Sequence, residues 1–190
     1  MNYADASHHI NSINGFMGSL AQREFMFNLA KTTDKAAEIG SFKGLSAAIV
    51  AMGMNSVTKD KNPEYYCIDT FEASNEELNS EATLDEFIRA TQPIDRNKSI
   101  KIVKGWSTAP ETLAQIPFEL DWVYIDGDHS TEGVIADIRA YTPHVKQEGL
   151  VLFHDHTWDS VRAGVNHFVE KENSIRLVSY FDDFGIYKKI

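Results

Sequence analysis

The chain has 190 residues, of which 43% are hydrophobic and 24% are charged, close to the average usage of a globular domain. Its 18 basic and 28 acidic residues give a formal net charge of −10, which argues against binding nucleic acid by neutralising phosphates. The lone cysteine, Cys67, excludes an intrachain disulfide framework and a multi-cysteine zinc site.

The start of the chain and its hydropathy give no sign of export or of membrane insertion. Residues 1–10 lack the basic region and long apolar run of a signal peptide, and no stretch reaches roughly 18 apolar residues. We therefore expect a cytoplasmic protein with no membrane partner and no nucleic-acid partner. Assembly into a homo-oligomer stays an open alternative.

The expected elements alternate between short apolar strands and helices, after an N-terminal part, residues 1–31, that we expect to be helical. This alternation is typical of an α/β fold with a mainly parallel sheet. The expected strands are 36–39, 65–68, 100–103, 122–125, 150–153, 175–180 and 185–188. The expected helices are 45–54, 109–115, one carrying Val134, Ile138 and Tyr141, and one carrying Val161, Val165 and Phe168.

A long polar segment, 70–98, interrupts this alternation and is partly helical, with Leu84, Phe87 and Ile88 on one face. At the other end of the chain, only four residues join the last two strands, which predicts a terminal antiparallel hairpin. We expect one domain over residues 1–190, in which 70–98 is an insertion that acts as a lid over the site.

Polar side chains follow directly after five of the expected strands. The carboxyl ends of parallel strands share one edge of an open sheet, where ligands bind. The sequence therefore predicts one site at this edge. Its candidate segments are Glu38 to Gly40, Asp69, Gly105 to Ser107, Asp126 to His129, and His154 to His156.

The segment from Glu38 to Gly44 has a Gly-x-x-x-Gly spacing between a strand and a helix. Glycine lets the backbone turn tightly and approach a ligand, and the helix start offers free N–H groups. The pattern is neither the three-glycine dinucleotide fingerprint nor a P-loop, so tight pyrophosphate binding is not expected. These residues alone leave an ordinary strand-to-helix turn open.

Acidic residues and histidines end the other strands. An acid at the position of Asp69 typically binds ribose hydroxyls, although a helix-capping or turn role is open. Asp126-Gly127-Asp128-His129 brings like charges together, which a metal ion or a cationic ligand would offset. With the neighbouring His154-Asp155-His156, this set suits a divalent ion, and a histidine suits a general base. Alternatively, Asp128 or Ser130 caps the next helix and some histidines are only hydrogen-bonded.

Several motifs together resemble those of class I S-adenosylmethionine-dependent methyltransferases. Residues 37–47 resemble the first motif of that family, closest to its catechol O-methyltransferase-like branch. Residues 126–130 and 149–155 look like those of macrocin-type sugar O-methyltransferases. The resemblance covers about residues 34–170 and implies a Rossmann-like, seven-stranded, mostly parallel sheet with an antiparallel C-terminal hairpin and helices on both faces.

The resemblance also implies an S-adenosylmethionine site. The loop after the first strand would flank the methionine part, and the following helix start would hold its carboxylate. The acid after the second strand would bind the ribose, and the loop after the third strand would contact adenine. The implied contacts are Glu38, Gly40, Ser41 and Phe42 for the methionine part and Ser46 for its carboxylate. They are Asp69 for the ribose and Trp106, Ser107 and Thr108 for adenine, and Asp126 completes the set.

In metal-dependent relatives, the positions of Asp126 and Asp155 carry metal-binding aspartates, and the position of His129 carries a catalytic lysine or histidine. The chain departs from the pattern at His154-Asp155-His156, where catechol-type enzymes have Asp-Asn and macrocin-type enzymes have Asp-Asp or Glu-Asp. One carboxylate is thus replaced or lost. Either His154 or His156 completes a divalent-metal site that favours Mn, Fe or Zn over Mg, or a histidine acts as a base without metal.

We therefore expect methyl transfer from S-adenosylmethionine to an oxygen of a small-molecule or sugar acceptor, with Asp126 and His129 as the catalytic residues. His129 would take the proton, and a metal on Asp126 and Asp155 would lower the hydroxyl pKa. Two alternatives stay open: a metal-dependent, hydroxylase-like enzyme on the same scaffold, and a non-catalytic cofactor-binding module. A base beside two aspartates argues against the second, because binding alone needs no base.

Overall fold

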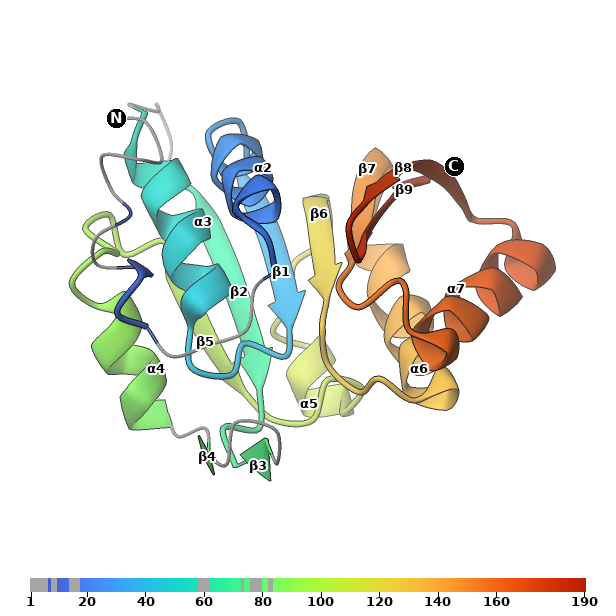
Figure 1. Cartoon of the computed structure of the whole chain (residues 1–190), viewed down its shortest axis with the longest axis horizontal. Coiled ribbons are helices and arrows are strands. Elements are labelled where there is room, and N and C mark those ends of the chain that lie inside the picture. The colour runs from blue at the N-terminus through green and yellow to red at the C-terminus, as the bar shows by residue number, and fades with distance from the viewer. Residues whose placement is uncertain are drawn as a thin grey trace.

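The computed structural model describes residues 7, 10–13, 18–57, 62–72, 74–75, 80–81 and 84–190. These residues form a seven-stranded sheet with the order β5-β2-β1-β6-β7-β9-β8 and a separate two-stranded ribbon, β3-β4 (Figure 1). The strands of the sheet are β1 (Lys35–Ile39), β2 (Glu64–Asp69), β5 (Ile100–Lys104), β6 (Leu120–Ile125), β7 (Val145–Phe153), β8 (Ile175–Phe181) and β9 (Phe184–Lys189).

The pairing of the strands confirms the predicted sheet. β1 pairs in parallel with β2 and β6, β2 with β5, and β6 with β7. β9 runs antiparallel to both β7 and β8, and this is the predicted C-terminal hairpin. The sheet is therefore parallel apart from one strand near its end.

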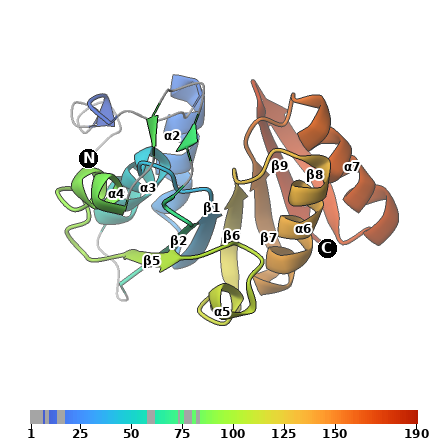
Figure 2. The same ribbon diagram turned by 90° about the horizontal axis from the view of Figure 1, so that it is seen from below.

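Helices cover both faces of the sheet, as the views in Figures 1 and 2 show. One side carries α2 (Leu20–Ala30), α3 (Leu45–Asn55) and α4 (Leu84–Thr91). The other side carries α5 (Pro110–Leu113), α6 (Thr131–Tyr141) and α7 (Asp159–Glu172), and the short 3-10 turn η1 (Thr142–His144) leads from α6 into β7. No helix within the described ranges combines the length and the apolarity that crossing a membrane requires.

A separate hydrophobic cluster lies on each face. The first joins α2, α3 and α4 to Tyr65 and Trp122 of the sheet, and the second joins α6 and α7 to Val123 and Phe153. Helix α3 is buried along almost its whole length, because alanine and glycine let its neighbours come close. A Cβ at Gly53 would lie only 2.3 Å from the carbonyl oxygen of Phe27 in α2.

Part of the expected lid and of the expected N-terminal helices falls outside the described residues. Within 70–98 the structure describes α4 and the ribbon of β3 (Ser74–Asn75) and β4 (Ser80–Glu81), but not 73, 76–79 or 82–83. In Figure 1 the ribbon lies below the carboxyl end of β2. Within 1–31, α2 is described, whereas 1–6, 8–9 and 14–17 are not. The lid therefore stays a prediction.

Candidate active site

The site lies where the order of the parallel strands reverses, between the adjacent strands β1 and β6. The chain after β1 passes to α3 on one face, and the chain after β6 passes to α6 on the other (Figure 2). The two strand ends are joined by the Asp126 N–H, which donates to the Ile39 carbonyl at 3.0 Å. In open α/β sheets, ligands bind at such a reversal point.

Gly40 brings the loop after β1 against the loop after β6. Its φ of 87° lies in the left-handed region that favours glycine. A Cβ at this position would lie 2.0 Å from the Asp126 carbonyl oxygen, which is closer than any side chain could approach. The two loops therefore form one continuous wall of the site.

Polar groups are buried beneath this first loop. Glu38 and Ser41 are buried, and Glu38 Oε2 accepts a hydrogen bond of 2.7 Å from the Tyr65 hydroxyl. Burial raises the pKa of Glu38, although the hydroxyls of Ser46 and Tyr65 oppose the rise. Within the described residues, Glu38 Oε1 and Ser41 Oγ have no hydrogen-bond partner. A bound ligand or water would supply the missing partners, because native structures leave few buried polar atoms without one.

The start of α3 and the end of β2 lie beside this loop. Gly44 is the N-cap of α3, and no side chain caps the helix there, so its first N–H groups face the loop. Asp69 accepts hydrogen bonds from the backbone N–H groups of Phe42, at 2.8 Å, and Phe71, at 2.7 Å. Asp69 therefore holds the loop after β1 to the loop after β2.

The loop after β5 carries the three residues expected at adenine. Trp106 is 77% exposed and Thr108 is also exposed. Ser107 Oγ donates to Asp137 Oδ1 at 2.6 Å, and the Tyr141 hydroxyl donates to the Ser107 carbonyl at 2.8 Å. Helix α6 thus fixes the middle of the loop, while the side chains on either side of Ser107 are exposed.

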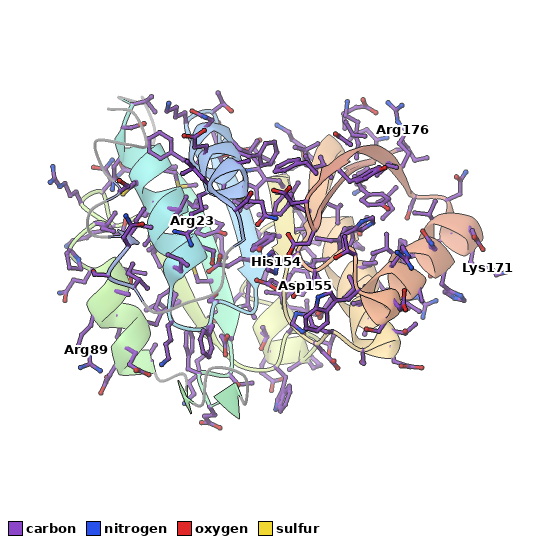
Figure 3. All side chains as sticks on the ribbon, viewed as in Figure 1. Arg23, Arg89, His154, Asp155, Lys171 and Arg176 are labelled. Carbon is purple, nitrogen blue, oxygen red and sulfur yellow. The ribbon has the colours of Figure 1, made fainter. Side chains whose placement is uncertain are left out.

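Two histidines and two aspartates converge at the ends of β6 and β7. His154 Nδ1 lies 3.2 Å from both Asp126 Oδ1 and Asp155 Oδ2. His129 Nε2 lies 3.5 Å and 3.2 Å from the same two oxygens. The His154 side chain is only 4% exposed, whereas that of His129 is 38% exposed. Figure 3 shows His154 and Asp155 next to each other near the middle of the molecule.

The four groups alter one another's proton affinity. Burial alone would raise the pKa of Asp126, but His154 and His129 bring it below its ordinary value. Burial alone would lower the pKa of His154, but Asp126 and Asp155 outweigh it and raise the pKa to about 11. Interaction with Asp126 raises the pKa of His129 as well. Positive charge is therefore strongly favoured between these two carboxylates.

The donor chemistry of this cluster suits a divalent metal ion. In the described part of the chain, Asp126, His154 and Asp155 form a group whose ligand atoms all lie within 4.8 Å of one another. Carboxylate oxygen and imidazole nitrogen are both common metal ligands. The fourth expected ligand, His156, lies outside this group, and its Nε2 is 2.9 Å from the Tyr187 hydroxyl. Its role as a ligand stays a prediction without geometric support.

Three further residues of the site were not predicted from the sequence. The Tyr124 hydroxyl donates to Asp126 Oδ2 at 3.2 Å, and Asp183 Oδ2 lies 4.0 Å from His154 Nε2. The third is Asp137. The sequence does contain a signal for Asp137: it lies three residues after Val134 and four before Tyr141, which places a carboxylate on the apolar face of α6. Asp183 lies in the turn between β8 and β9, and its sequence position gives no hint of this contact.

The family comparison gives the class of enzyme. A family model described as "Methyltransferase domain" matches residues 37–156, which include the glycine loop and the histidine–aspartate cluster. The chain belongs to this methyltransferase family. A search of curated proteins found no match to this methyltransferase.

Solved structures support the fold of this methyltransferase. The O-methyltransferase NovP superposes with a TM-score of 0.74 at 16% identity, covering 90% of this chain and 80% of NovP. The O-methyltransferase of Bacillus cereus, in complex with SAH, has a TM-score of 0.68 at 15% identity and coverages of 98% and 88%. TomG of Streptomyces achromogenes, in complex with SAM, has a TM-score of 0.69 at 13% identity, with the same coverages. These matches give no support to the hydroxylase-like alternative.

Proposed function

We propose that this methyltransferase moves the methyl group of S-adenosylmethionine to a hydroxyl oxygen of a small molecule. The observation that carries the proposal is the His129–Asp126–Asp155–His154 cluster, which shares a wall with the glycine loop through the contact of Gly40 with Asp126. The three solved structures described above are all O-methyltransferases, and two of them hold SAM or SAH. A cofactor loop and a basic group at one wall are what methyl transfer to a hydroxyl requires.

The cofactor would lie along the carboxyl ends of β1, β2 and β5. The uncapped N–H groups at the start of α3 suit the methionine carboxylate, with Ser41 and Ser46 beside them. Asp69 uses one lone pair on each oxygen for backbone N–H groups and keeps others for the ribose hydroxyls. Exposed Trp106 offers an apolar surface to adenine.

The reaction forms an oxygen–carbon bond and breaks a sulfur–carbon bond. The acceptor oxygen attacks the methyl carbon, the sulfonium sulfur leaves with the bonding electron pair as S-adenosylhomocysteine, and the hydroxyl proton passes to the imidazole of His129. His129 suits this role because it is 38% exposed at the mouth of the cluster, with Asp126 and Asp155 beside it to stabilise the imidazolium. Glycine at position 40 lets the cofactor loop approach this point closely.

A metal ion at Asp126, His154 and Asp155 would supply Lewis acidity that makes a nearby hydroxyl easier to deprotonate. Two roles do not depend on a bound ion: Asp126 orients His129, and Tyr124 fixes Asp126 through its hydrogen bond to Oδ2.

For the acceptor, we propose a small hydroxylated molecule of the sugar class, because residues 126–130 and 149–155 resemble those of macrocin-type sugar O-methyltransferases. The net charge of −10 disfavours a polyanionic acceptor such as RNA. Helix α4 and the β3–β4 ribbon, which belong to the predicted lid, lie on the chain between the ribose-side strand β2 and the adenine-side strand β5. Loops at this edge commonly set specificity, so we place acceptor selection there.

The decisive test is His129→Ala in the full chain. A panel of sugars, catechols and phenols is first incubated with wild-type protein and S-adenosylmethionine, and products heavier by one methylene are sought by mass spectrometry. With the acceptor so found, we expect turnover in His129→Ala to fall by roughly 100-fold or more, since base catalysis contributes that much. Binding of S-adenosylhomocysteine, measured by calorimetry, should not change.

His167→Ala is the matched control, because His167 is an exposed histidine two helical turns beyond the start of α7. It should leave turnover at the wild-type level. Undiminished turnover in His129→Ala would remove His129 as the base. Absence of S-adenosylhomocysteine binding by the wild-type protein would overturn the cofactor assignment.

A further inference from the structure

The metal-ligand set of this chain contains an imidazole at its most buried position. His154 Nδ1 lies 3.2 Å from Asp126 Oδ1 and 3.2 Å from Asp155 Oδ2, so one small ion could contact all three atoms. The three residues come from the ends of two adjacent parallel strands, β6 and β7, whose register pairs Ile125 with Phe153. The pairing of β6 with β7 therefore brings the three ligand residues, which directly follow these strands, next to one another.

Asp126 Oδ1, Asp155 Oδ2 and His154 Nδ1 face one another, and His129 Nε2 lies 3.5 Å and 3.2 Å from the two oxygens, so an ion bound at this point would take the place of a proton on His154. Asp126 gives its other oxygen, Oδ2, to the Tyr124 hydroxyl at 3.2 Å. The outward nitrogen of His154, Nε2, is buried and has no hydrogen-bond partner among the described residues. Asp183 Oδ2 lies 4.0 Å from this nitrogen. A carboxylate behind the second ring nitrogen is the usual support of a metal-binding histidine, because it orients the ring and makes it more basic.

Charge also balances in this arrangement. Once an ion replaces the proton on His154, two carboxylates and one neutral imidazole carry a charge of about −2, which a divalent cation neutralises in a largely buried place. The Asp126 and Asp155 side chains are 16% and 13% exposed, so water screens them only in part.

We infer that this site takes a transition-metal ion such as Mn²⁺, Co²⁺ or Zn²⁺ in preference to Mg²⁺, with His154 Nδ1, Asp126 Oδ1 and Asp155 Oδ2 as its ligands. The inference rests on the proposed function, because it concerns the same site. Mg²⁺ favours oxygen ligands in an octahedral arrangement, whereas imidazole nitrogen favours the later divalent metals. We leave His129 outside the ligand set, because the group whose ligand atoms all lie within 4.8 Å of one another consists of Asp126, His154 and Asp155, and because the His129 side chain is 38% exposed, against 4% for His154. It remains free to take a proton.

The experiment measures metal binding directly, with no cofactor, acceptor or turnover involved. The full chain is stripped with EDTA, and Zn²⁺, Mn²⁺ and Mg²⁺ are each titrated into it by calorimetry at pH 7. We expect one site for Zn²⁺ and Mn²⁺ that binds at least tenfold more tightly than any site for Mg²⁺. Co²⁺ bound in the same site should show visible absorption that Zn²⁺ displaces.

Three variants separate the roles of the histidines. His154→Gln should weaken Zn²⁺ binding by roughly 100-fold, since a ligand is lost. His154→Asp restores an all-oxygen set and should shift preference back toward Mg²⁺. His129→Gln and the surface control His167→Gln should both keep wild-type Zn²⁺ affinity. Circular dichroism and S-adenosylhomocysteine binding show whether each variant is folded.

Two results would overturn the inference. One is Mg²⁺ binding as tight as Zn²⁺ and Mn²⁺ binding in the wild-type protein, or no binding of any of them. The other is a loss in His129→Gln as large as the loss in His154→Gln. Either can occur while methyl transfer and cofactor binding persist, so failure here is distinct from failure of the proposed function.

Discussion

Asp137 places a carboxylate on the buried face of α6, between Val134 and Tyr141. Its Oδ1 accepts a hydrogen bond from Ser107 in the loop expected at adenine. Burial raises its pKa from 3.8 to about 6, the Ser107 hydroxyl opposes the rise, and the charge of Asp128 adds to it. The ionised Asp137 carboxylate thus destabilises the folded state, but it also fixes the loop after β5 through its hydrogen bond with Ser107.

The sign of its contribution follows from that rise in pKa. Between pH 3.8 and about 6 the folded state binds more protons than the unfolded state, so stability falls as the pH rises through this window. Above pH 6 the whole penalty is present, on the order of 3 kcal/mol for a rise of about two pKa units.

Asp137→Asn should remove this penalty, because the amide is neutral and its oxygen can still accept from Ser107. We expect the variant to be more stable than wild type at pH 7, by up to about 3 kcal/mol, and of similar stability at pH 4. Urea unfolding at the two pH values gives the difference directly. A stability difference that does not change with pH would show that Asp137 does not titrate in this way.

His154, Asp155 and His156 show why neighbouring residues of one motif have different surroundings. The backbone leaves the strand at Asp155 with a φ of 49°, in the left-handed region. His154 and Asp155 contact Asp126, while His156 lies against Tyr187 of β9. The sequence predicts that all three residues lie at one strand end. Which of them face Asp126 depends on the geometry of the turn, which residue spacing does not reveal.

At the scale of elements, helix α6 begins at a defined cap beside the cluster. Ser130 is its N-cap, and Ser130 Oγ accepts from the Gly133 N–H at 3.0 Å. The neighbouring Asp128 Oδ1 accepts from the Ser130 N–H at 2.8 Å. Both residues were candidates for capping from sequence, and the structure gives the cap to Ser130 and the turn before it to Asp128.

Ser130→Ala should lower the free energy of unfolding by about 1 kcal/mol, because the Gly133 N–H loses its partner. For a chain of this length that corresponds to a fall in Tm of roughly 2–4 °C, which calorimetry can resolve. Ser130→Asp supplies an equivalent acceptor and should recover most of the loss. Equal losses in the two variants would mean that the cap contributes nothing.

The strands show how much of the sheet can be predicted from runs of apolar residues. Each buried apolar run was found as a strand, but β7 begins at Val145, five residues before the expected start. The residues between are largely exposed and polar, and a register irregularity lies opposite them: Leu120 pairs with Val145, and Trp122 with Leu150. A polar segment that has extra residues relative to its partner strand has no apolar alternation to detect.

At the scale of the whole molecule, cofactor binding should stabilise the fold. A ligand that binds only the folded state adds about 2.7 kcal/mol at 100 times its Kd. We expect S-adenosylhomocysteine at saturating concentration to raise Tm by several degrees, whereas NAD and ATP should have no effect. Stabilisation by NAD or ATP alone would favour a different nucleotide-binding function.

The position of the site followed from topology rather than from any single motif. Once β1, β2, β5, β6 and β7 are parallel, their carboxyl ends must share an edge, and Gly40, Asp69 and Asp126 come together there. The contributions of Tyr124 and Asp183 could not be foreseen, because they depend on which way one hydroxyl points and on where a distant hairpin turn lies.

The close approach of Gly40 to Asp126 has a thermodynamic consequence. The loop that would meet the methyl donor and the aspartate that would meet an ion share one backbone contact, so neither can shift without displacing the other. We therefore expect binding of one ligand to alter the affinity for the other, and this effect is reciprocal: if a bound ion raises the affinity for the cofactor tenfold, about 1.4 kcal/mol, a bound cofactor raises the affinity for the ion tenfold. In that case each ligand binds more tightly when the other is already bound.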